Sequence, residues 1–578
     1  MKRIFLLLNI FLMSFPSFAE GWKFDYSASS VTSSGTGAVL PFWARTVQGG
    51  YMPDVASAVV TGGADILYTS PKGVFFGAGA NLVGSLTSPS VVCDAKVSGL
   101  VDRLYLTAGW RMLHADIGLK PRQREFCDLS LTGGDLALSG YARNLPGVNL
   151  WSDWIYFEKG HWVGVKGNFA QYKMMDNRYV KGTLLHNKSI AFHLSLGRKV
   201  DLEAGLDHWV QWGGVSPVLG ERPATWKDYY RVIFARQGGE DATDSDRQNA
   251  LGNHLGREFV RVRWRAPKFT MTFQYDMPYE DGRGTIKIQN APDGVYSLVF
   301  NLKDRSGIVT DVVYEYVHTT WQSGDVHDRP ATEEEMTKVY PENVDNYWQR
   351  PGDFYYGRIV IGGRDNYFNN GEYPSGWTYH GRTLGLPLIT PMAANADGVV
   401  MGVENNRIRA HHIGIKGNMG LVPYGFKATY SSNWGRFGMP ADSRFHSHPW
   451  QLSLAFELEL GRNLTNLPVA FAVGAYGDFG ELYQDCVGLS LRIVYGKSIM
   501  SFGNRHHSFI FLNYFSKLGL LGLATKQKYL CMSYLRKVGY YFLHQFEWIN
   551  FPFMLGKWCN AYPYFILTFW CSYIGKHL

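Results

Sequence analysis

The sequence predicts an all-β fold, a large antiparallel transmembrane β-barrel of about 16 to 18 strands with short helical or loop plug elements. Three observations support this prediction. Apolar and polar residues alternate with period two in many short segments, which places one set of side chains on each face of a sheet. The composition combines 64 Gly and 15% aromatic residues with only 18% charged residues, as in strand-rich chains. The N-terminus also has the pattern of an export signal.

The N-terminal residues show the three parts of a secretory signal peptide. Lys2 and Arg3 precede an apolar stretch, and Ser17-Phe18-Ala19 has the small-x-small pattern of a cleavage site. Residues 1–19 are therefore predicted to be a signal peptide, and residues 20–58 an N-terminal periplasmic or plug segment.

Two segments in the middle of the chain alternate almost without exception. In the first, Arg261, Arg263 and Arg265 point to one face and Val262 and Trp264 to the other. The next segment places apolar residues opposite polar ones, at Phe269, Met271, Phe273 and Tyr275 against Thr270, Thr272, Gln274 and Asp276. Since Ala266-Pro267 supplies a turn between them, the two segments predict a hairpin with one apolar and one polar face. Residues 451–460 and 487–495 alternate in the same way.

This alternation fits either a soluble sandwich or a membrane barrel with lipid outside and a polar lumen. Strand-like segments fill residues 59–497 without an obvious linker, and soluble sandwiches rarely grow so large as one unit. A barrel in the outer membrane of a Gram-negative bacterium explains an exported chain of this kind better, because closure pairs every backbone group. Trp110, Trp209, Trp212 and Trp264 lie near strand ends and suit its interfacial girdles.

Several stretches do not alternate and are predicted to be loops or plug elements. Residues 211–225 form one, and residues 241–256 another, with a short helix that begins near Asp244 and ends by Gly252. Residues 325–351 are acidic and bounded by Pro, which suits a long external loop. Residues 365–387 are dense in Asn, Gly and aromatic residues and are expected near the lumen.

The net charge of +8 lies mostly at the C-terminal end. Residues 498–578 hold eight Lys and Arg against one acidic residue, Glu547, so the barrel region is nearly neutral and no basic patch for nucleic acid is expected. The same residues show no clean alternation. They are interpreted as an atypical C-terminal extension, either a frameshift or read-through product or a basic, aromatic appendage that lies on the membrane surface.

The loops carry a family resemblance. The stretches that bear it are Leu40-Pro41-Phe42-Trp43, Leu136 to Gly140, Gln211-Trp212-Gly213-Gly214, Asn249 to Asn253-His254, Glu280-Asp281-Gly282 with Pro292-Asp293-Gly294, and Asp365 to Tyr373, which includes Glu372, followed by Gly376 to Tyr379. Taken together over about residues 30 to 497, they resemble the Wzi-type capsule assembly family of outer-membrane proteins in its Bacteroidetes-like form. The segment after Lys497 departs from that family.

The resemblance implies a surface lectin, a non-enzymatic outer-membrane barrel that binds or organises capsular polysaccharide at the cell surface. The expected partners are capsular or other surface polysaccharide, outer-membrane lipid and the barrel assembly machinery, and the barrel is expected to be a monomer. The alternative is a passive outer-membrane channel or transporter.

Residues 365–382 supply the groups that bind sugars. Aromatic rings stack on the C–H faces of sugar rings, while amides hydrogen-bond to sugar hydroxyls and cations pair with acidic substituents. The candidate polysaccharide-binding residues are Asn366, Tyr367, Asn369, Asn370, Trp377, Tyr379 and Arg382, with Arg261 and Arg263 as candidates to attract an anionic polymer. The same groups suit a hydrogen-bonded plug, and the two arginines suit ion pairs across neighbouring strands.

Catalytic and metal chemistry is disfavoured by the sequence. Glu280 and Asp281 could supply the two carboxylates that glycoside hydrolysis needs, but the Asp281-Gly282 step is more simply a turn. No Gly-x-Ser-x-Gly, His-Glu-x-x-His or paired Cys-x-x-Cys pattern occurs in residues 59–497. No catalytic residue, metal site or cofactor is therefore expected.

Overall fold

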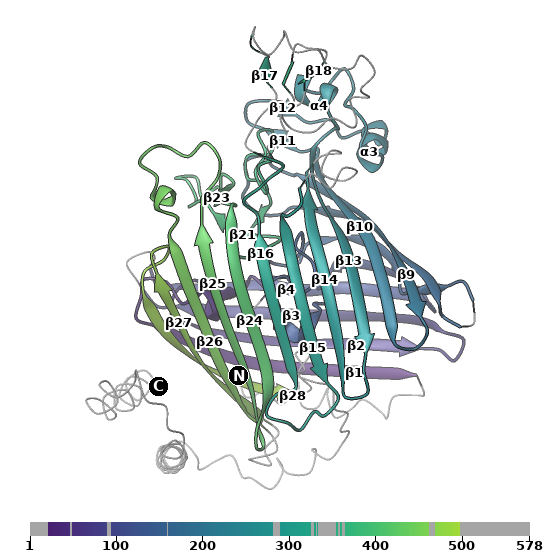
Figure 1. Cartoon of the computed structure of the whole chain (residues 1–578), viewed down its shortest axis with the longest axis vertical. Coiled ribbons are helices and arrows are strands. Elements are labelled where there is room, and N and C mark those ends of the chain that lie inside the picture. The colour runs from purple at the N-terminus through teal and green to yellow at the C-terminus, as the bar shows by residue number, and fades with distance from the viewer. Residues whose placement is uncertain are drawn as a thin grey trace, which may run out of the picture. The chain divides into compact units, whose positions relative to one another are not determined.

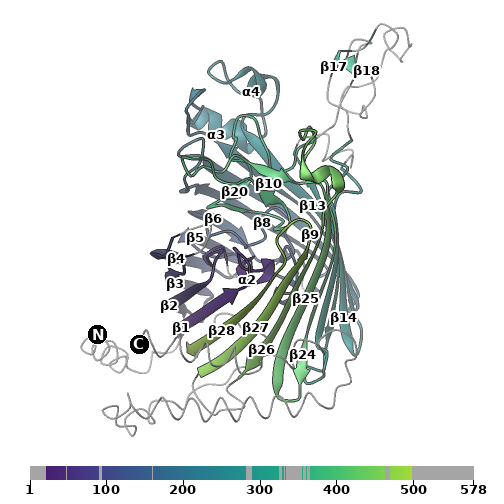
Figure 2. The ribbon, with the colours of Figure 1, turned by 90° about the vertical axis from the view of Figure 1, so that its left-hand side faces the viewer.

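The computed structural model describes residues 21–46, 49–89, 94–158, 160–280, 290–324, 329–330, 332, 354–355, 359–360, 365–461 and 469–496. They belong to one unit of the chain, Met1–Asn504. Their main feature is a closed antiparallel barrel of 18 strands, in which the first strand pairs with the last (Figures 1 and 2). The predicted fold class and strand number are confirmed.

Each barrel strand pairs with its neighbours in chain order. The strands are β1 (Trp22–Gly35), β2 (Ser57–Thr69), β3 (Val74–Thr87), β4 (Lys96–Trp110), β5 (Leu113–Leu119), β6 (Pro146–Ser152), β8 (Val163–Lys173), β9 (Leu184–Leu196), β10 (Val200–Trp212), β13 (Asn253–Arg265), β14 (Phe269–Tyr279), β15 (Gly294–Leu302), β16 (Asp311–His318), β24 (Ile408–Met419), β25 (Val422–Asn433), β26 (Trp450–Leu460), β27 (Val469–Gly480) and β28 (Cys486–Gly496). The short β7 (Ile155–Tyr156) extends β6 along β8.

The outer face of the barrel is apolar. On β28, every second residue is a large exposed apolar side chain: Val487, Leu489, Leu491, Ile493 and Tyr495 are 36–49% exposed. On β13, Val260 is 52% and Trp264 41% exposed, while the inward Arg261 is 5% exposed. A continuous band of exposed apolar residues suits lipid rather than water, so this is a barrel of the outer-membrane type. The hairpin predicted for residues 261–276 is confirmed by the register of β13 and β14.

Two details of the sequence prediction are corrected. The barrel begins at Trp22 rather than near Val59, because β1 pairs with both β2 and β28 and closes the sheet. Among the described residues of the predicted N-terminal plug segment, Gly21 and residues 36–46 and 49–56 lie outside the barrel strands. Trp209 and Trp212 are 0% and 5% exposed, and they point into the protein rather than toward an interfacial girdle.

The two ends of the barrel differ. At one end short turns join the strands, such as residues 111–112 and 420–421, and both the first and the last barrel strand have their outer ends there. At the other end the connections are long, including residues 36–56, 120–145, 213–252 and 319–407. Figure 1 shows α3 (Trp226–Ile233) and α4 (Asp244–Gln248) of the third connection and β23 (Val403–Asn405) of the fourth at the top. We name these the turn end and the loop end. The described residues contain no helix long and apolar enough to cross a membrane.

The loops contain short elements. The helices in the described part of the chain are α2 (Phe42–Thr46), α3 (Trp226–Ile233) and α4 (Asp244–Gln248), with 3-10 turns at Phe126–Asp128 and Arg444–Ser447. The short strand pairs and triplet are β11 (Val215–Ser216) with β12 (Gly220–Glu221), β17 (Arg329–Pro330) and β18 (Phe354–Tyr355) with β19 (Ile359–Val360), β20 (Thr378–Tyr379) with β21 (Arg382–Thr383), and β22 (Thr390–Pro391) with β23 (Val403–Asn405).

The predicted loops are found with shorter bounds, because residues 211–212 belong to β10 and residues 253–256 belong to β13. Residues 213–225 connect β10 to α3, and the helix predicted after Asp244 is α4, capped by the side chain of Thr243. The predicted signal peptide, almost all of the loop at 325–351 and the extension at 498–578 lie outside the described residues.

Three loop-end segments fold into the barrel, and we name them together the plug: residues 36–56, 120–145 and 365–407. They bond to each other and to the wall. His412 on β24 makes a 2.6 Å hydrogen bond with the carbonyl of Leu129, and the Trp43 indole donates to Thr429 on β25. Buried apolar side chains of all three segments form one core, including Leu40, Trp43, Leu131, Leu136, Tyr141, Tyr367, Trp377, Leu384 and Leu386. Figure 2 shows α2 inside the barrel wall.

Candidate functional site

The Asn-rich stretch predicted to bind sugar lies in the plug. The Asn366 side chain accepts hydrogen bonds from the Asn369 and Asn406 side chains, and the Asn369 side-chain oxygen accepts from the Val403 N–H. The Asn370 side chain accepts the N–H groups of residues 372 and 373, which is an Asx turn. These amides are therefore used within the chain.

The aromatic residues of the same stretch are buried. Tyr367, Trp377 and Tyr379 are at most 2% exposed. The Tyr367 hydroxyl donates to Asp293, and the Trp377 indole donates to the carbonyl of Ala137 at 2.7 Å. Their ring faces pack in the core of the plug, where no sugar reaches them in this conformation.

The three predicted cations also have protein partners. Arg382 donates to the Met52 carbonyl and pairs with Asp54 at 2.9 Å. Arg261 pairs with Glu125 and Glu203, and Arg263 pairs with Glu203. Of the two roles that the sequence allowed, the geometry brings these residues together as internal bonds of the barrel.

The residues that carry the family resemblance gather at one junction. Trp212 stacks on Tyr229 of α3, with ring centroids 5.2 Å apart. Asn253 donates to Gln211, which in turn donates to the Gly376 carbonyl of the plug. His254 hydrogen-bonds to His208 at 2.9 Å. Gln211 thus joins β10 to the plug and Trp212 joins β10 to α3, while Asn253 and His254 bond β13 to β10.

The remaining motif residues have simple local roles or lie outside the description. Gly213 and Gly214 turn the chain after β10 with φ of 61° and 87°, and a Cβ on Gly214 would lie 2.8 Å from the Lys181 carbonyl oxygen. Asn249 ends α4 as its C-cap residue, and the Asp365 N–H donates to the Gln322 carbonyl. Asp281 and Gly282 lie outside the described residues.

Glu280, considered as a catalytic carboxylate, supports the plug instead. Its two oxygens accept the N–H groups of Asn366 and Phe368, each at 3.1 Å. The carboxylate thus positions the start of the Asn-rich stretch.

Glu372 takes part in a charged cluster at the loop end. Arg222 pairs with Glu372 and with Asp246, the latter at 2.7 Å, and Glu372 also accepts from Thr243. Burial raises the pKa of Asp246 to about 6, with a further contribution from Glu372, while the Gly252 N–H and Arg222 oppose the shift. The cluster ties the loop containing α4 to the plug.

Helix α3 presents exposed aromatic residues at the loop end. Trp226, Tyr230 and the C-cap residue Phe234 are 83%, 49% and 56% exposed. Their i, i+4, i+8 spacing places them along one side, and the Tyr230 and Phe234 ring centroids lie 4.7 Å apart. A capping box between Thr225 and Asp228 fixes the start of the helix. We name these three residues the α3 stripe. The guanidinium of Arg236 lies 5.4 Å from the Tyr230 ring centroid.

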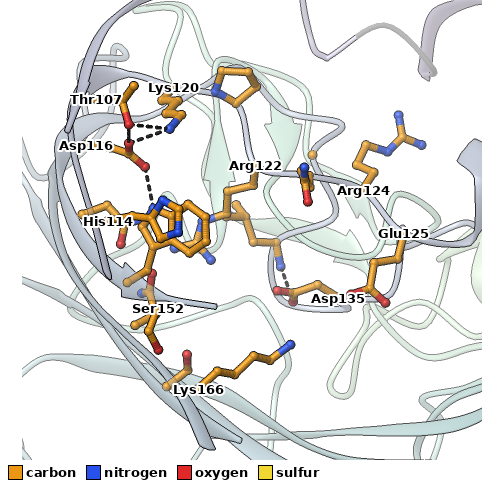
Figure 3. A pocket seen from close by; sticks show the side chains of 18 of the residues that line it. Thr107, His114, Asp116, Lys120, Arg122, Arg124, Glu125, Asp135, Ser152 and Lys166 are labelled. Atoms are coloured by element: carbon orange, nitrogen blue, oxygen red, sulfur yellow. Dashed lines mark hydrogen bonds and ion pairs between the residues drawn. The ribbon is translucent and has the colours of Figure 1, made fainter. Parts of the chain in front are cut away.

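A cavity of about 820 Å³ occupies the lumen between the plug and the turn end. It reaches from Arg122 and Arg124 of the plug to Thr69 and Arg111, which lie where strands meet the short turns. Figure 3 shows plug residues Arg122, Arg124, Glu125 and Asp135 in this cavity with strand residues Thr107, His114, Asp116 and Lys166. The His114 and Trp151 rings stack at 3.8 Å in its wall.

The cations around this cavity affect its carboxylates. Burial alone would raise the pKa of Glu125, but Arg261 and Lys166 lower it below its usual value. Glu125 is therefore ionised at neutral pH and pairs with Arg261.

Sequence reasoning missed both the α3 stripe and the cavity. The alternating cations Lys120, Arg122 and Arg124 were a visible signal for a charged inward segment. The aromatic spacing from Trp226 to Phe234, every fourth residue, is a sequence signal for one face of a helix.

No family model and no curated protein matches this chain. Among solved structures it is similar to Wzi, an outer-membrane protein involved in group 1 capsule assembly in Escherichia coli and a carbohydrate-binding β-barrel. The identity is 12%, over 81% of this chain and 84% of that one, with a TM-score of 0.48. It is also similar to OccAB1 of Acinetobacter baumannii, at 10% identity over 83% and 98% of the two chains and a TM-score of 0.41. OprD of Pseudomonas aeruginosa matches at 9% over 85% and 98%, with a TM-score of 0.40. These likenesses concern the fold alone.

Proposed function

We propose that this protein is a non-enzymatic outer-membrane barrel that holds capsular or other surface polysaccharide at its loop end. The observation that carries the proposal is the α3 stripe, a row of exposed aromatic faces on the long loops. Outer-membrane barrels place their short turns in the periplasm and their long loops outside, so the stripe faces the cell exterior in this proposal. The motifs that resemble the Wzi-type family support the same function.

The α3 stripe suits sugar binding for two reasons. Exposed aromatic faces are costly in water unless they serve a contact, and a row of three offers successive stacking surfaces to a repeating polymer. Lys227 and Arg236 are exposed nearby and can pair with acidic groups on such a polymer. Several weak contacts along one chain add to retention, because each later contact becomes intramolecular.

The plug supports a holding function over a transport function. Its three segments bond to each other and to strands β14, β16, β24 and β25, and they share one apolar core within the lumen. A lumen occupied in this way favours a surface role for the loops.

Retention on immobilised capsule tests the proposal. We expect the full-length barrel in detergent to be retained above an unrelated porin, and the double variant W226A/Y230A to lose most of that retention. The control is Trp162→Ala, which removes a Trp that is 58% exposed at the turn end and is expected to change nothing. Equal retention of the double variant and the wild type would contradict the role of the α3 stripe.

The second candidate function is a passive channel or transporter, and the observation that favours it is the 820 Å³ cavity in the lumen. The two functions differ in conductance. A plugged barrel is expected to conduct almost no ions in a planar bilayer, whereas an open porin conducts steadily. Steady conductance by the wild-type chain, together with no retention on capsule, would favour the channel.

A further inference from the structure

The cavity between the plug and the turn end contains cations that the barrel does not pair. Arg257 has Asp135 and Asp276 within 3.2 Å, and Arg261 has two carboxylates. Arg122, Arg124 and Lys166 also line the cavity, but no carboxylate of the described residues lies within 4.0 Å of their nitrogens. The cations that line the cavity are thus of two kinds, those paired with a carboxylate and those that are not.

The unpaired cations are held in place by neutral groups. Arg122 donates to the Tyr172 hydroxyl and the Asn187 side chain, and its guanidinium lies 4.7 Å from the Trp209 ring centroid. The Lys166 ammonium lies 4.6 Å from the ring of Trp154. Such contacts orient a cation without neutralising it.

Arg124 is the cation that most clearly lacks a hydrogen-bond acceptor. Its guanidinium lies 4.2 Å from the Tyr141 ring centroid, and its side chain passes beside Gly133 and Gly140, where an added Cβ would lie 3.1 Å from it. Its Nε and one terminal nitrogen are buried and have no hydrogen-bond partner. Buried guanidinium nitrogens without an acceptor are costly, so an acceptor from outside the chain is expected beside these two atoms.

The same cavity also contains a buried acceptor that lacks a hydrogen-bond donor. The side-chain oxygen of Asn149 on β6 is buried and has no hydrogen-bond donor. A ligand that satisfies both positions therefore needs an anionic acceptor for Arg124 and a hydroxyl or similar donor for Asn149.

We propose that this cavity binds a small sugar acid, a polyhydroxylated molecule with one or two carboxylates, which enters from the turn end. The volume of about 820 Å³ lies in the range of ordinary small-molecule sites. Carboxylates pair with Arg122, Arg124 and Lys166, and hydroxyl groups donate to Asn149. The site is separate from the α3 stripe and does not rest on the function proposed for it.

Calorimetry on the full-length barrel in detergent tests the site with three probes: digalacturonate, the neutral disaccharide maltose, and inorganic sulfate. We expect digalacturonate to bind more tightly than either of the others, with an affinity that falls as salt rises. Preference for sulfate over digalacturonate, or equal binding of maltose, would overturn the sugar-acid assignment. No binding of digalacturonate by the wild type would overturn it as well.

Variants identify the residues. Arg124→Gln and Lys166→Gln are each expected to weaken digalacturonate binding about tenfold, and Asn149→Ala by a few-fold, as for lost charged and neutral hydrogen bonds. The control Lys72→Gln removes an exposed cation of a short turn outside the cavity and is expected to bind as the wild type does. Unchanged binding by both cavity cation variants would reject the site.

Two further measurements keep the result interpretable. Each variant is compared with the wild type for migration on gels without boiling, which reports barrel folding. The variant W226A/Y230A is expected to bind digalacturonate normally, so failure of the surface-glycan function and failure of this site give different results.

Discussion

Trp377 and Ala137 are joined by an indole N–H···O hydrogen bond of 2.7 Å, although 240 residues separate them in the chain. Trp377 is fully buried, and Leu386 donates to the carbonyl of Leu136 beside it. Two plug segments therefore form one body through backbone carbonyls that the sequence pattern does not reveal.

Replacing Trp377 by Phe is expected to loosen the plug. The Ala137 carbonyl then loses its donor while it stays buried, which costs about 1–3 kcal/mol. Hydrogen exchange at residues 136–139 should become faster, while exchange in barrel strands stays the same. Trp226→Phe, at an exposed position, serves as the control. Unchanged exchange at these residues in Trp377→Phe would show that the bond contributes nothing to the plug.

The charged cluster of Arg222, Asp246 and Glu372 predicts a pH dependence of the loop that contains α4. Because the pKa of Asp246 is raised to about 6 from 3.8, the closed loop binds the proton more tightly than an opened loop does. The closed loop therefore becomes more stable as pH falls from 7 toward 4. Above the raised pKa, Asp246 is ionised and its burial destabilises the closed loop in full.

Hydrogen exchange of residues 243–252, expressed as protection relative to the unfolded chain, measures this effect. Protection is expected to increase between pH 7 and pH 5 in the wild type and to be nearly independent of pH in Asp246→Asn. A decrease of protection on acidification in the wild type would mean that the sign is wrong.

The barrel and the presence of plug elements were predictable from the sequence, but the contacts within the plug were not, for a physical reason. Side chains on β28 or β13 face either lipid or lumen, so one property decides each position and the period of two survives. Plug residues such as Tyr367 are in contact with other residues on all sides. Their sequence therefore has no periodic pattern from which their carbonyl or carboxylate partners could be predicted. The same Asn, Tyr and Trp residues suit a sugar site or a buried network, and only the distances distinguish the two.

Helix α3 offers a prediction about local stability. Thr225 accepts from the Asp228 N–H, and the Asp228 carboxylate accepts from the Thr225 N–H. Thr225→Ala removes one half of this capping box, and the expected cost to the helix is about 1 kcal/mol. Exchange at residues 228–231 should become roughly fivefold faster, and Thr225→Ser should restore it. Equal exchange in Thr225→Ala and the wild type would rule out the cap as a determinant of the helix.

The outward face of β28 provides a test of the membrane barrel itself. Leu491 is 36% exposed and alternates with the inward-facing Arg492. Leu491→Arg is expected to destabilise the inserted barrel by up to about 2–4 kcal/mol if the site lies near the bilayer midplane, because a charge must then face lipid. Leu491→Phe keeps the side chain apolar and is the matched control. The folded fraction, read from the migration of unboiled samples after refolding into vesicles, should fall in Leu491→Arg and stay unchanged in Leu491→Phe. Equal folding of the two variants would mean that this face of the strand does not contact lipid.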